Sequence, residues 1–375
     1  ACQKAFPMSE PLPTPPKTAA EALDWLRLIR SPRIGPVTFR RLMAEHGSAA
    51  AALVALPQIA KAASTDGYEA CSIARAEAEY AAGLKVGARL LALGEAAYPN
   101  ALCDLHDAPP LLWAFGDVDL AQRSAVAIVG ARNASALGLR MARILAKGLG
   151  KSEQVVVSGL ARGIDAAAHE AAMETGTIAV LAGGVDVPYP AENAALARQI
   201  YRHGLLLSEQ PMGLQPQARH FPRRNRLISG LGQALVVVEA AVKSGSLITA
   251  RDALDQGREV MAVPAHPFDA RSGGSNQLIR DGALLVRGTN DILAALPHTT
   301  ATERQEEVPA VIQAPVPGTD VRSAILTCLA ADPVAEHLVS ETTQIPSDVI
   351  AHHLTELELE GVVARQPGGL VARVA

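Results

Sequence analysis

This sequence has few aromatic residues, few cysteines and no excess of basic residues. Aromatics make up only 3% of its 375 residues and apolar residues 49%, so we expect a core of alanine, valine, leucine and isoleucine. The four cysteines, Cys2, Cys71, Cys103 and Cys328, are too far apart to predict a disulfide framework or a zinc site. The net charge of -4 excludes a global basic field, so nucleic-acid binding would need local basic clusters. No run of about 18 apolar residues and no apolar leader is found, which favours a cytoplasmic protein that does not span a membrane.

Composition divides the chain into five segments. Residues 1–18 contain five prolines and are expected to form a disordered lead. Residues 19–97 are predicted to be a small helical domain and residues 98–297 an α/β domain. A polar, proline-rich linker at 298–318 is then followed by a winged-helix domain at 319–375.

Seven short apolar runs recur through the central segment, separated by helical stretches. The runs are Ala125–Val129, Val155–Val157, Ile178–Leu181, Leu205–Leu207, Ala234–Val238, Val260–Val263 and Ala283–Val286. Because they do not alternate between apolar and polar residues, they predict parallel strands buried on both faces. The order of strands and helices therefore predicts an α/β fold with a doubly wound, mostly parallel, Rossmann-like sheet.

Two helices joined by a short turn are predicted in the helical domain, at Ala20–Arg30 and Val37–His46. The turn Ile34-Gly35-Pro36 between them is typical of a helix–hairpin–helix. The motif contains five arginines, Arg27, Arg30, Arg33, Arg40 and Arg41. Such a hairpin offers backbone amides to phosphate but equally suits a protein contact, and the sequence leaves both possibilities open.

The last segment is predicted to be an acidic winged helix. Its helices and wing strands are predicted at Val321–Leu329, Pro333–Thr342, Ser347–Glu360, Gly361–Ala364 and Leu370–Val374, with the wing turn at Pro367-Gly368-Gly369. The third helix, which normally enters the DNA groove, has four acidic residues and no lysine or arginine. Eight acidic residues face three arginines from Asp320 onward, so phosphate would be repelled. We therefore predict that this domain contacts protein, with Leu354, Leu357 and Val362 in its own core.

Glycine-rich loops follow several of the predicted central strands. They are Gly130–Gly138, Ser158–Asp165, Gly183–Asp186 and Ser244–Ser246. In an open α/β sheet these loops share one edge, where amides and helix N-termini bind anions. Glycine that merely relieves crowding is the alternative interpretation. The dinucleotide motif G-x-G-x-x-G is missing, and Gly150-Lys151-Ser152 is not a Walker A motif because Leu145 replaces its first glycine.

Arginines near these loops favour DNA as the ligand. Arg132 and Arg162 lie in the loops, and Phe221 precedes a cluster of three arginines placed just before a helix predicted at Leu227–Leu231. Guanidinium groups suit phosphates and an aromatic ring can stack on a base, although a solvated basic face with a buried phenylalanine is the alternative. The predicted DNA-binding residues are Gly130, Arg132, Asn133, Arg162, Arg219, Phe221, Arg223, Arg224, Asn225, Arg226, Ser244, Gly245, Ser246 and Thr249.

Several sequence blocks follow one another in order across roughly residues 100–290. They are Ile128–Arg132, Ser158–Asp165 with His169, Tyr189-Pro190 with Asn193, Ser208-Glu209, Phe221–Arg226, Ser244–Ser246 with Thr249, and Gly273 to Gly282. In these blocks the chain strongly resembles the DprA/Smf family. The resemblance implies a Rossmann-like core that binds single-stranded DNA, forms a homodimer through this domain and loads RecA recombinase in natural transformation, with no enzymatic activity, metal or cofactor.

The resemblance also implies roles for individual residues. Arg132 matches a phosphate-contacting arginine of the family, and Phe221 matches a base-contacting aromatic. Basic residues that some members carry after the Tyr-Pro pair and before the phenylalanine are Ala191 and Ala218 here. Arg219, or Arg202, would then substitute for them.

Other polar residues have catalytic and structural interpretations. Asp165 and His169 share one helix face, where bracing of the loop and helix packing are favoured over a catalytic pair. Glu239 ends a strand, where capping of the Ser244–Ser246 loop is favoured over a catalytic base. His352 and His353 lack the further ligands that a metal site needs.

Two other functions compete with DNA binding. A Rossmann-like nucleotide phosphoribohydrolase would also use glycine-rich loops and an acid at a strand end, but its Pro-Gly-Gly-x-Gly-Thr loop is replaced here by Lys243–Ser246. A pure protein-interaction scaffold would leave the arginine cluster at 223–226 without a role.

Overall fold

The computed structural model describes residues 12–62, 67–296, 321–329, 334–343, 345–366 and 370–373. The chain divides into two compact units, Ala1–His298 and Thr299–Ala375. The predicted linker and the wing turn lie outside the described residues, as does most of the predicted lead. Within the described ranges, no helix has both the length and the apolar character needed to cross a membrane.

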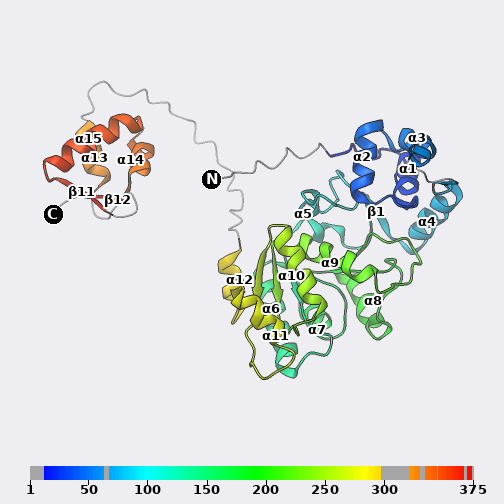
Figure 1. The fold of residues 1–375 in the computed structure, drawn as a ribbon. Coiled ribbons are helices and arrows are strands. Elements are labelled where there is room, and N and C mark those ends of the chain that lie inside the picture. The colour runs from blue at the N-terminus through cyan, green and yellow to red at the C-terminus, as the bar shows by residue number, and fades with distance from the viewer. Residues whose placement is uncertain are drawn as a thin grey trace. The chain divides into compact units, whose positions relative to one another are not determined.

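Four helices open the first unit: α1 (Ala19–Arg30), α2 (Pro36–His46), α3 (Ala49–Ala62) and α4 (Ile73–Val86), drawn in blue to cyan in Figure 1. The Thr18 hydroxyl caps α1 by accepting a hydrogen bond from a first-turn amide. Gly47, with φ of 73°, ends α2 in the left-handed conformation that favours glycine. The rings of Trp25 and Phe39 pack edge to face with centroids 5.0 Å apart, and both belong to a hydrophobic core that continues into the central sheet.

A nine-stranded sheet forms the centre of this unit. Its strands are β1 (Arg89–Ala92), β2 (Leu111–Gly116), β3 (Ala125–Val129), β4 (Val155–Ser158), β5 (Thr177–Val180), β6 (Leu205–Ser208), β7 (Ala234–Val237), β8 (Glu259–Ala262) and β9 (Leu284–Leu285). They lie in the order β1-β2-β6-β5-β4-β3-β7-β8-β9, and every pair from β6 to β9 is parallel. The chain winds outward from β3 to β6 and then returns to place β7 on the other side of β3. This arrangement confirms the predicted doubly wound sheet and puts its topological switch point between β3 and β7.

Helices cover both faces of the sheet, which explains the continuous apolar runs. The helices are α5 (Asn100–Cys103), α6 (Ala136–Lys151), α7 (Ile164–Ala172), α8 (Ala194–His203), α9 (His220–Leu231), α10 (Gly245–Asp255), α11 (Gly273–Arg280) and α12 (Thr289–Ala295). In β3, Val126 and Ile128 pack with α6 and α7, whereas Ala127 and Val129 pack with α9 and α10. Both sets of side chains are buried, so neither face requires polar residues.

The strands β1 and β2 differ from the sequence prediction. β1 lies inside the range predicted to be helical, and β2 falls on no predicted strand. The two strands pair antiparallel, and β2 pairs with β6, so they extend the sheet beyond β6. The β1 sequence Arg-Leu-Leu-Ala consists of residues that favour a helix and has no β-branched residue, so only pairing with β2 makes it a strand.

The helical segment is fastened to the sheet by buried polar contacts. Glu79 of α4 accepts hydrogen bonds from Arg30 (2.9 Å) and from the indole of Trp113 in β2 (2.9 Å). Arg40 donates to the Leu105 carbonyl at 3.2 Å. Arg30 also donates to the Glu209 carbonyl after β6 at 3.1 Å, so two of the five arginines of the hairpin motif tie the helices to segments that flank the sheet.

The second unit is a winged helix, as predicted. It consists of α13 (Val321–Cys328), β10 (Val334–Ala335), α14 (Glu336–Thr343), α15 (Ser347–Leu359), β11 (Val363–Gln366) and β12 (Leu370–Arg373), with strand order β10-β12-β11. Leu354 and Leu357 are each 1% exposed in its core, and Val362 is half-buried against it. The exposed side of α15 includes Glu356, and Arg322 forms an ion pair with Glu360.

Candidate nucleic-acid interface

The loops at the carboxyl ends of the central strands gather at one edge of the sheet. Those after β3, β4 and β7 border an open groove of about 740 Å³ at the switch point. The groove is lined by Val129, Gly130, Ala131, Arg132, Asn133, Ala161, Asp165, Ala218, Phe221, Pro222, Arg224, Asn225, Ile228, Ala241, Lys243, Ser244, Gly245, Ser246, Ile248, Thr249 and Arg271. Ten of the fourteen predicted DNA-binding residues are in this set.

Several of the glycines are needed because a side chain would clash with neighbouring atoms, which was the alternative to anion binding. A Cβ on Gly130 would lie 2.6 Å from the Ile164 side chain. Gly163 has φ of 77°, and a Cβ there would lie 2.3 Å from the Ala131 carbonyl oxygen. Gly245 differs, because no atom lies within 4 Å of its Cβ position and the residue is exposed. Within the described residues its amide donates to no protein acceptor, which leaves it available to an anion at the start of α10.

Phe221 lies between two arginines in the wall of the groove. The guanidinium carbon of exposed Arg132 is 5.3 Å from the Phe221 ring centroid, and that of buried Arg224 is 5.9 Å away. Tyr189 approaches the same ring with a centroid separation of 5.6 Å. The ring is half-buried, so part of it faces the groove beside the exposed guanidinium of Arg132.

Arg224 acts as a structural arginine. It donates to the carbonyl oxygens of Gly159 (2.6 Å) and Val180 and so ties α9 to the ends of β4 and β5. Burial, with a smaller contribution from nearby Arg132, lowers its pKa to about 10 against the opposing effect of Asp165. Its positive charge reaches the groove from behind Phe221 but is not exposed.

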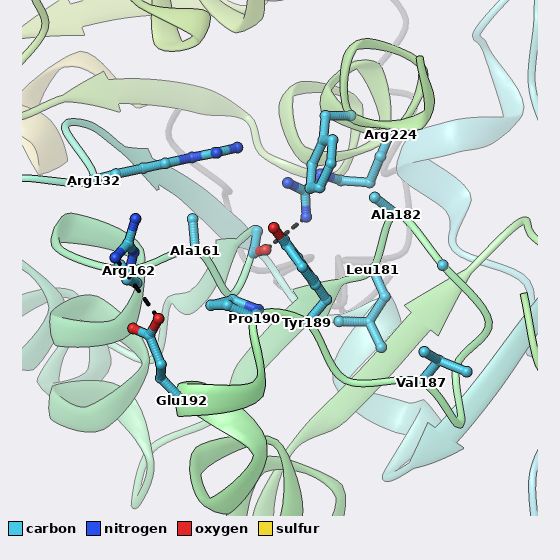
Figure 2. Close-up of a pocket in the computed structure, with 13 residues that line it drawn as sticks. Arg132, Ala161, Arg162, Leu181, Ala182, Val187, Tyr189, Pro190, Glu192 and Arg224 are labelled. Atoms are coloured by element: carbon cyan, nitrogen blue, oxygen red, sulfur yellow. Dashed lines mark hydrogen bonds and ion pairs between the residues drawn. The ribbon is translucent and has the colours of Figure 1, made fainter. Parts of the chain in front are cut away.

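A smaller pocket of about 110 Å³ adjoins the groove on the other side of Phe221. Figure 2 shows Arg132, Arg162 and Tyr189 around it, with Arg162 directed toward Glu192. That ion pair measures 3.7 Å and both side chains are exposed, so Arg162 is available at the rim. The two pockets share Arg132, Ala161, Phe221 and Arg224.

The hydroxyl residues near α10 mostly serve the local structure. Ser244 caps α10 by accepting from the Ser246 amide, and the Ser246 hydroxyl donates to the Gly130 carbonyl at 3.1 Å. Thr249 is buried and donates to the Gly245 carbonyl at 3.4 Å. These bonds hold the β3 and β7 loops together at the floor of the groove.

The predicted arginine cluster is divided between two sides of α9. The helix begins at His220 and not at the predicted Leu227, because Pro222 is tolerated in a first turn, where amides lack helical partners. Helical periodicity then directs Arg219, Arg223 and Arg226 away from Phe221, into a second groove. Those three arginines therefore do not line the groove that contains Arg132.

Arg226 is also neutralised. It forms ion pairs with Asp107 (3.3 Å) and Glu209 (2.5 Å), and all three side chains are largely buried. Burial raises the pKa of Glu209, whereas Arg226 and Arg30 act to lower it. A phosphate contact by Arg226 would have to disrupt this cluster.

Lys243 and Arg271 line the groove but were not predicted. Exposed Lys243 makes no ion pair with a described residue, whereas Arg271 is paired with Asp269 at 2.9 Å. Lys243 directly precedes the predicted loop Ser244–Ser246, and that adjacency was the available signal.

Asp165 and Glu239, for which a catalytic role was the alternative, both form hydrogen bonds that stabilise the local structure. Asp165 accepts hydrogen bonds from the amides of Gly159 (3.1 Å) and Ala161 (3.3 Å), which confirms that it braces the loop. Burial raises the pKa of Asp165, although Arg224 and these hydrogen bonds oppose the shift. The predicted partner of Glu239 was wrong. Because β7 lies beside β3, Glu239 caps α6 by accepting from the amide of Ser135 (2.9 Å) and from its hydroxyl.

No cluster of three or more potential ligands for a metal ion occurs among the described residues. His352 and His353 lie beside Glu356 on α15, and both imidazoles form their ion-pair contacts with that carboxylate. The groove offers backbone amides, an exposed arginine, a lysine and an aromatic ring. Together these groups suit a flexible polyanion that carries planar aromatic bases.

Comparison with known proteins gives consistent matches over most of the chain. Residues 89–297 match the family model for DNA recombination-mediator protein A, residues 19–82 a DprA-like N-terminal HHH domain and residues 309–369 a DprA winged-helix domain. The chain is 43% identical to the DNA processing protein DprA of Bacillus subtilis over 215 residues, which is 56% of this chain and 72% of that one.

Two solved structures are also similar. The DprA structure from Streptococcus pneumoniae has a TM-score of 0.62 and 36% identity, covering 73% of this chain and 98% of that one. The DprA structure from Helicobacter pylori, described for its single-stranded DNA binding mode, has a TM-score of 0.52 and 30% identity, covering 56% of this chain and 94% of that one.

Proposed function

The chain belongs to the family of DNA recombination-mediator protein A, and on that premise we propose that its central groove binds single-stranded DNA. The observation that carries the proposal is the pairing of exposed Arg132 with the half-buried ring of Phe221, 5.3 Å apart, at the topological switch point. Arg132, Lys243 and the Gly245 amide would contact phosphates, and Phe221 would stack on a base. The Helicobacter pylori relative, described as a single-stranded DNA binder, supports this assignment.

The geometry favours a single strand over a duplex. In a duplex the bases are stacked on one another, so a ring in a groove wall has no free base face to contact. Here Phe221 separates the open groove from the small pocket beside Tyr189, which offers space for an unstacked base. The phosphate contacts are independent of sequence, so we expect little base preference.

We further propose that the protein forms a homodimer through its central domain and loads RecA recombinase in natural transformation. The family membership supports both statements. We assign the winged helix to a protein contact, because α15 carries exposed Glu356 and Arg322 is already paired with Glu360. Phosphate would meet net negative charge on this domain.

The phosphoribohydrolase alternative is less well supported. It needs a free carboxylate at the end of β7, and Glu239 is only 6% exposed and accepts hydrogen bonds from both the amide and the hydroxyl of Ser135. We expect no release of a nucleobase from nucleoside monophosphates. Stoichiometric release that is lost in Glu239→Gln would favour the enzyme.

The test is a salt titration of binding to fluorescent oligothymidylate and to a duplex of equal length. Log affinity for the single strand should fall linearly with log salt, with a slope of about -0.7 per phosphate contacted. Arg132→Ala should weaken binding and make the slope shallower by about one contact, or about 0.7. Lys151→Ala is the matched control, because Lys151 is exposed at the far end of α6, at the opposite edge of the sheet.

Two results would overturn the proposal. One is an affinity for single strands that does not depend on salt. The other is equal behaviour of Arg132→Ala and Lys151→Ala, with melting temperatures unchanged, because Arg132 would then lie outside the binding site.

A further inference from the structure

A second groove of about 730 Å³ runs between the helical segment and the central sheet. Its lining comes from the α1–α2 turn, the start of α4, the segment before β2, the loop after β6 and the start of α9. The proposed DNA contacts in the first groove leave this groove without a role, although three of the arginines predicted to bind DNA, Arg219, Arg223 and Arg226, line it.

The two grooves share one wall, helix α9. With 3.6 residues per turn, Phe221, Asn225 and Ile228 fall on one side of the helix, and Arg219 and Arg223 fall on the opposite side. The first three residues line the first groove and the two arginines line the second. Opposite sides of a helix lie about 10–12 Å apart, so the N-terminal turn of α9 is a narrow ridge between the grooves.

The carboxylates of the second groove are already paired. Asp107 and Glu209 are ion-paired with Arg226, and Glu79 beside the groove is ion-paired with Arg30 at 2.9 Å. These groups form compact, largely buried clusters, so they leave little negative charge at the surface of the groove.

Three exposed arginines remain on the walls of this groove. Arg75, Arg219 and Arg223 make no ion pair with a described residue, and all three line the groove. The groove therefore carries an excess of positive charge in a molecule whose net charge is -4. Guanidinium groups spaced along a groove suit successive phosphates of a nucleic-acid backbone.

The helical segment adds backbone donors to the same groove. Helix α2 begins at Pro36 after Gly35, its N-cap, with no side chain capping it, and both residues line the groove. Its free first-turn amides and the helix dipole favour an anion at that end. This contribution supports the arginines, which carry the inference.

We propose that a single strand bound in the first groove crosses the N-terminal turn of α9 and continues into the second groove, where Arg219, Arg223 and Arg75 bind its phosphates. This inference rests on the proposed function and adds a second section to the binding site. It assigns the helix–hairpin–helix segment, through Arg75 and the α2 N-terminus, to the far end of the DNA path.

The experiment compares oligothymidylates of about 4 to about 30 nucleotides on the full-length chain, using the triple variant Arg75→Gln, Arg219→Gln, Arg223→Gln. The shortest oligonucleotides, which fill only the first groove, should bind the variant and the unmodified protein alike. Long oligonucleotides should bind the variant more weakly, and the length at which affinity stops rising should become shorter. Loss of three phosphate contacts should make the salt slope shallower by about 2, so that each doubling of salt narrows the affinity difference about fourfold.

Two comparisons keep this test specific. The triple variant Lys85→Gln, Lys147→Gln, Lys151→Gln removes the same charge from exposed positions that line neither groove. Arginine-to-lysine replacement at 75, 219 and 223 keeps the charge and should restore most of the long-oligonucleotide affinity. A melting curve for each variant shows whether the fold is retained.

Three outcomes would overturn the inference. In the first, the arginine triple variant has the same length dependence and salt slope as the unmodified protein, while Arg132→Ala still weakens binding. That result leaves the proposed function intact. The second is no effect of either the arginine triple or Arg132→Ala, in which case the proposed function fails as well. In the third, the arginine triple variant keeps the DNA footprint of the unmodified protein but no longer binds a polyglutamate peptide. That result would assign the groove to an acidic protein segment.

Discussion

His169 makes the stability of the first unit depend on pH. The imidazole is fully buried, and its Nδ1 lies 2.7 Å from the hydroxyl oxygen of Thr177. That hydroxyl donates its own proton to the Val156 carbonyl at 2.8 Å, so it accepts from a protonated Nδ1. Nε2 has no hydrogen-bond partner among the described residues, so the neutral tautomer with its proton on Nδ1 is the one that fits.

Protonation of Nε2 would bury a charge with no acceptor. Burial, with Arg224 acting in the same direction, lowers the pKa of His169 from 6.5 to about 3. A histidine whose folded pKa is depressed contributes stability above its unfolded pKa and loses that contribution as pH falls toward the folded value. The window for this residue therefore runs from pH 6.5 down to about 3.

The expected loss follows from 1.36 kcal/mol per pH unit within this window. At about pH 5 the first unit should be about 2 kcal/mol less stable than at neutral pH through His169 alone. That is a large share of the roughly 5–15 kcal/mol typical of a folded domain.

The assay is urea unfolding followed by tryptophan fluorescence between about pH 7.5 and about pH 5. Both tryptophans, Trp25 and Trp113, belong to the first unit, so the signal reports on that unit. His169→Asn places an amide donor near the Nδ1 position and removes the titration. It should be less stable at neutral pH but should lose about 2 kcal/mol less on acidification than the unmodified protein.

The exposed His203, at the end of α8, provides the matched control. His203→Asn should retain the full dependence on pH. Other groups that titrate contribute equally to every variant, so the difference in slope isolates His169. If His169→Asn and the unmodified protein lose the same stability between neutral pH and pH about 5, the reasoning about the buried neutral imidazole is wrong.

Three further predictions concern the site and the second unit. Arg226→Ala should destabilise the first unit by about 3–5 kcal/mol, because Glu209 would be left buried without its partner, whereas exposed Arg223→Ala should change unfolding by less than about 0.5 kcal/mol. Equal melting temperatures for the two variants would contradict the buried ion-pair cluster. Phe221→Ala should weaken single-stranded DNA binding by about 1–3 kcal/mol through the loss of base stacking, as measured by fluorescence anisotropy. A lower melting temperature with unchanged affinity would instead make Phe221 a core residue. Deleting residues 299–375 should leave single-stranded DNA affinity nearly unchanged or slightly higher, since the winged helix is acidic; a large loss in a folded, still dimeric truncation would return that domain to DNA binding.

The central sheet was largely predictable because its strands are buried on both faces. Continuous runs such as Ala125–Val129 result directly from that environment, and the structure places β3 at these same residues. The strands β1 and β2 were not predicted. β1 consists of arginine, leucine and alanine, which favour a helix, and only its pairing with β2 makes it a strand.

The candidate site was predictable where topology alone gathers residues. Loops at the carboxyl ends of parallel strands share one edge in any doubly wound sheet, so Gly130, Arg132 and Gly245 could be grouped from sequence order. The partner of Glu239 could not be, because it depends on β7 lying beside β3, and that adjacency is a property of strand order in space.

The sequence by itself determined which arginines exist near Phe221, and only the tertiary structure decided what each of them can bind. Starting α9 at His220 rather than Leu227 changes the direction in which Arg223 and Arg226 point, by the helical periodicity of 3.6 residues. The charge of Arg226 is then cancelled by Glu209 and by Asp107, which is 119 residues away in the chain. Local patterns carry no information on contacts at that separation, because folding, and not sequence distance, brings a carboxylate within 4 Å of a guanidinium.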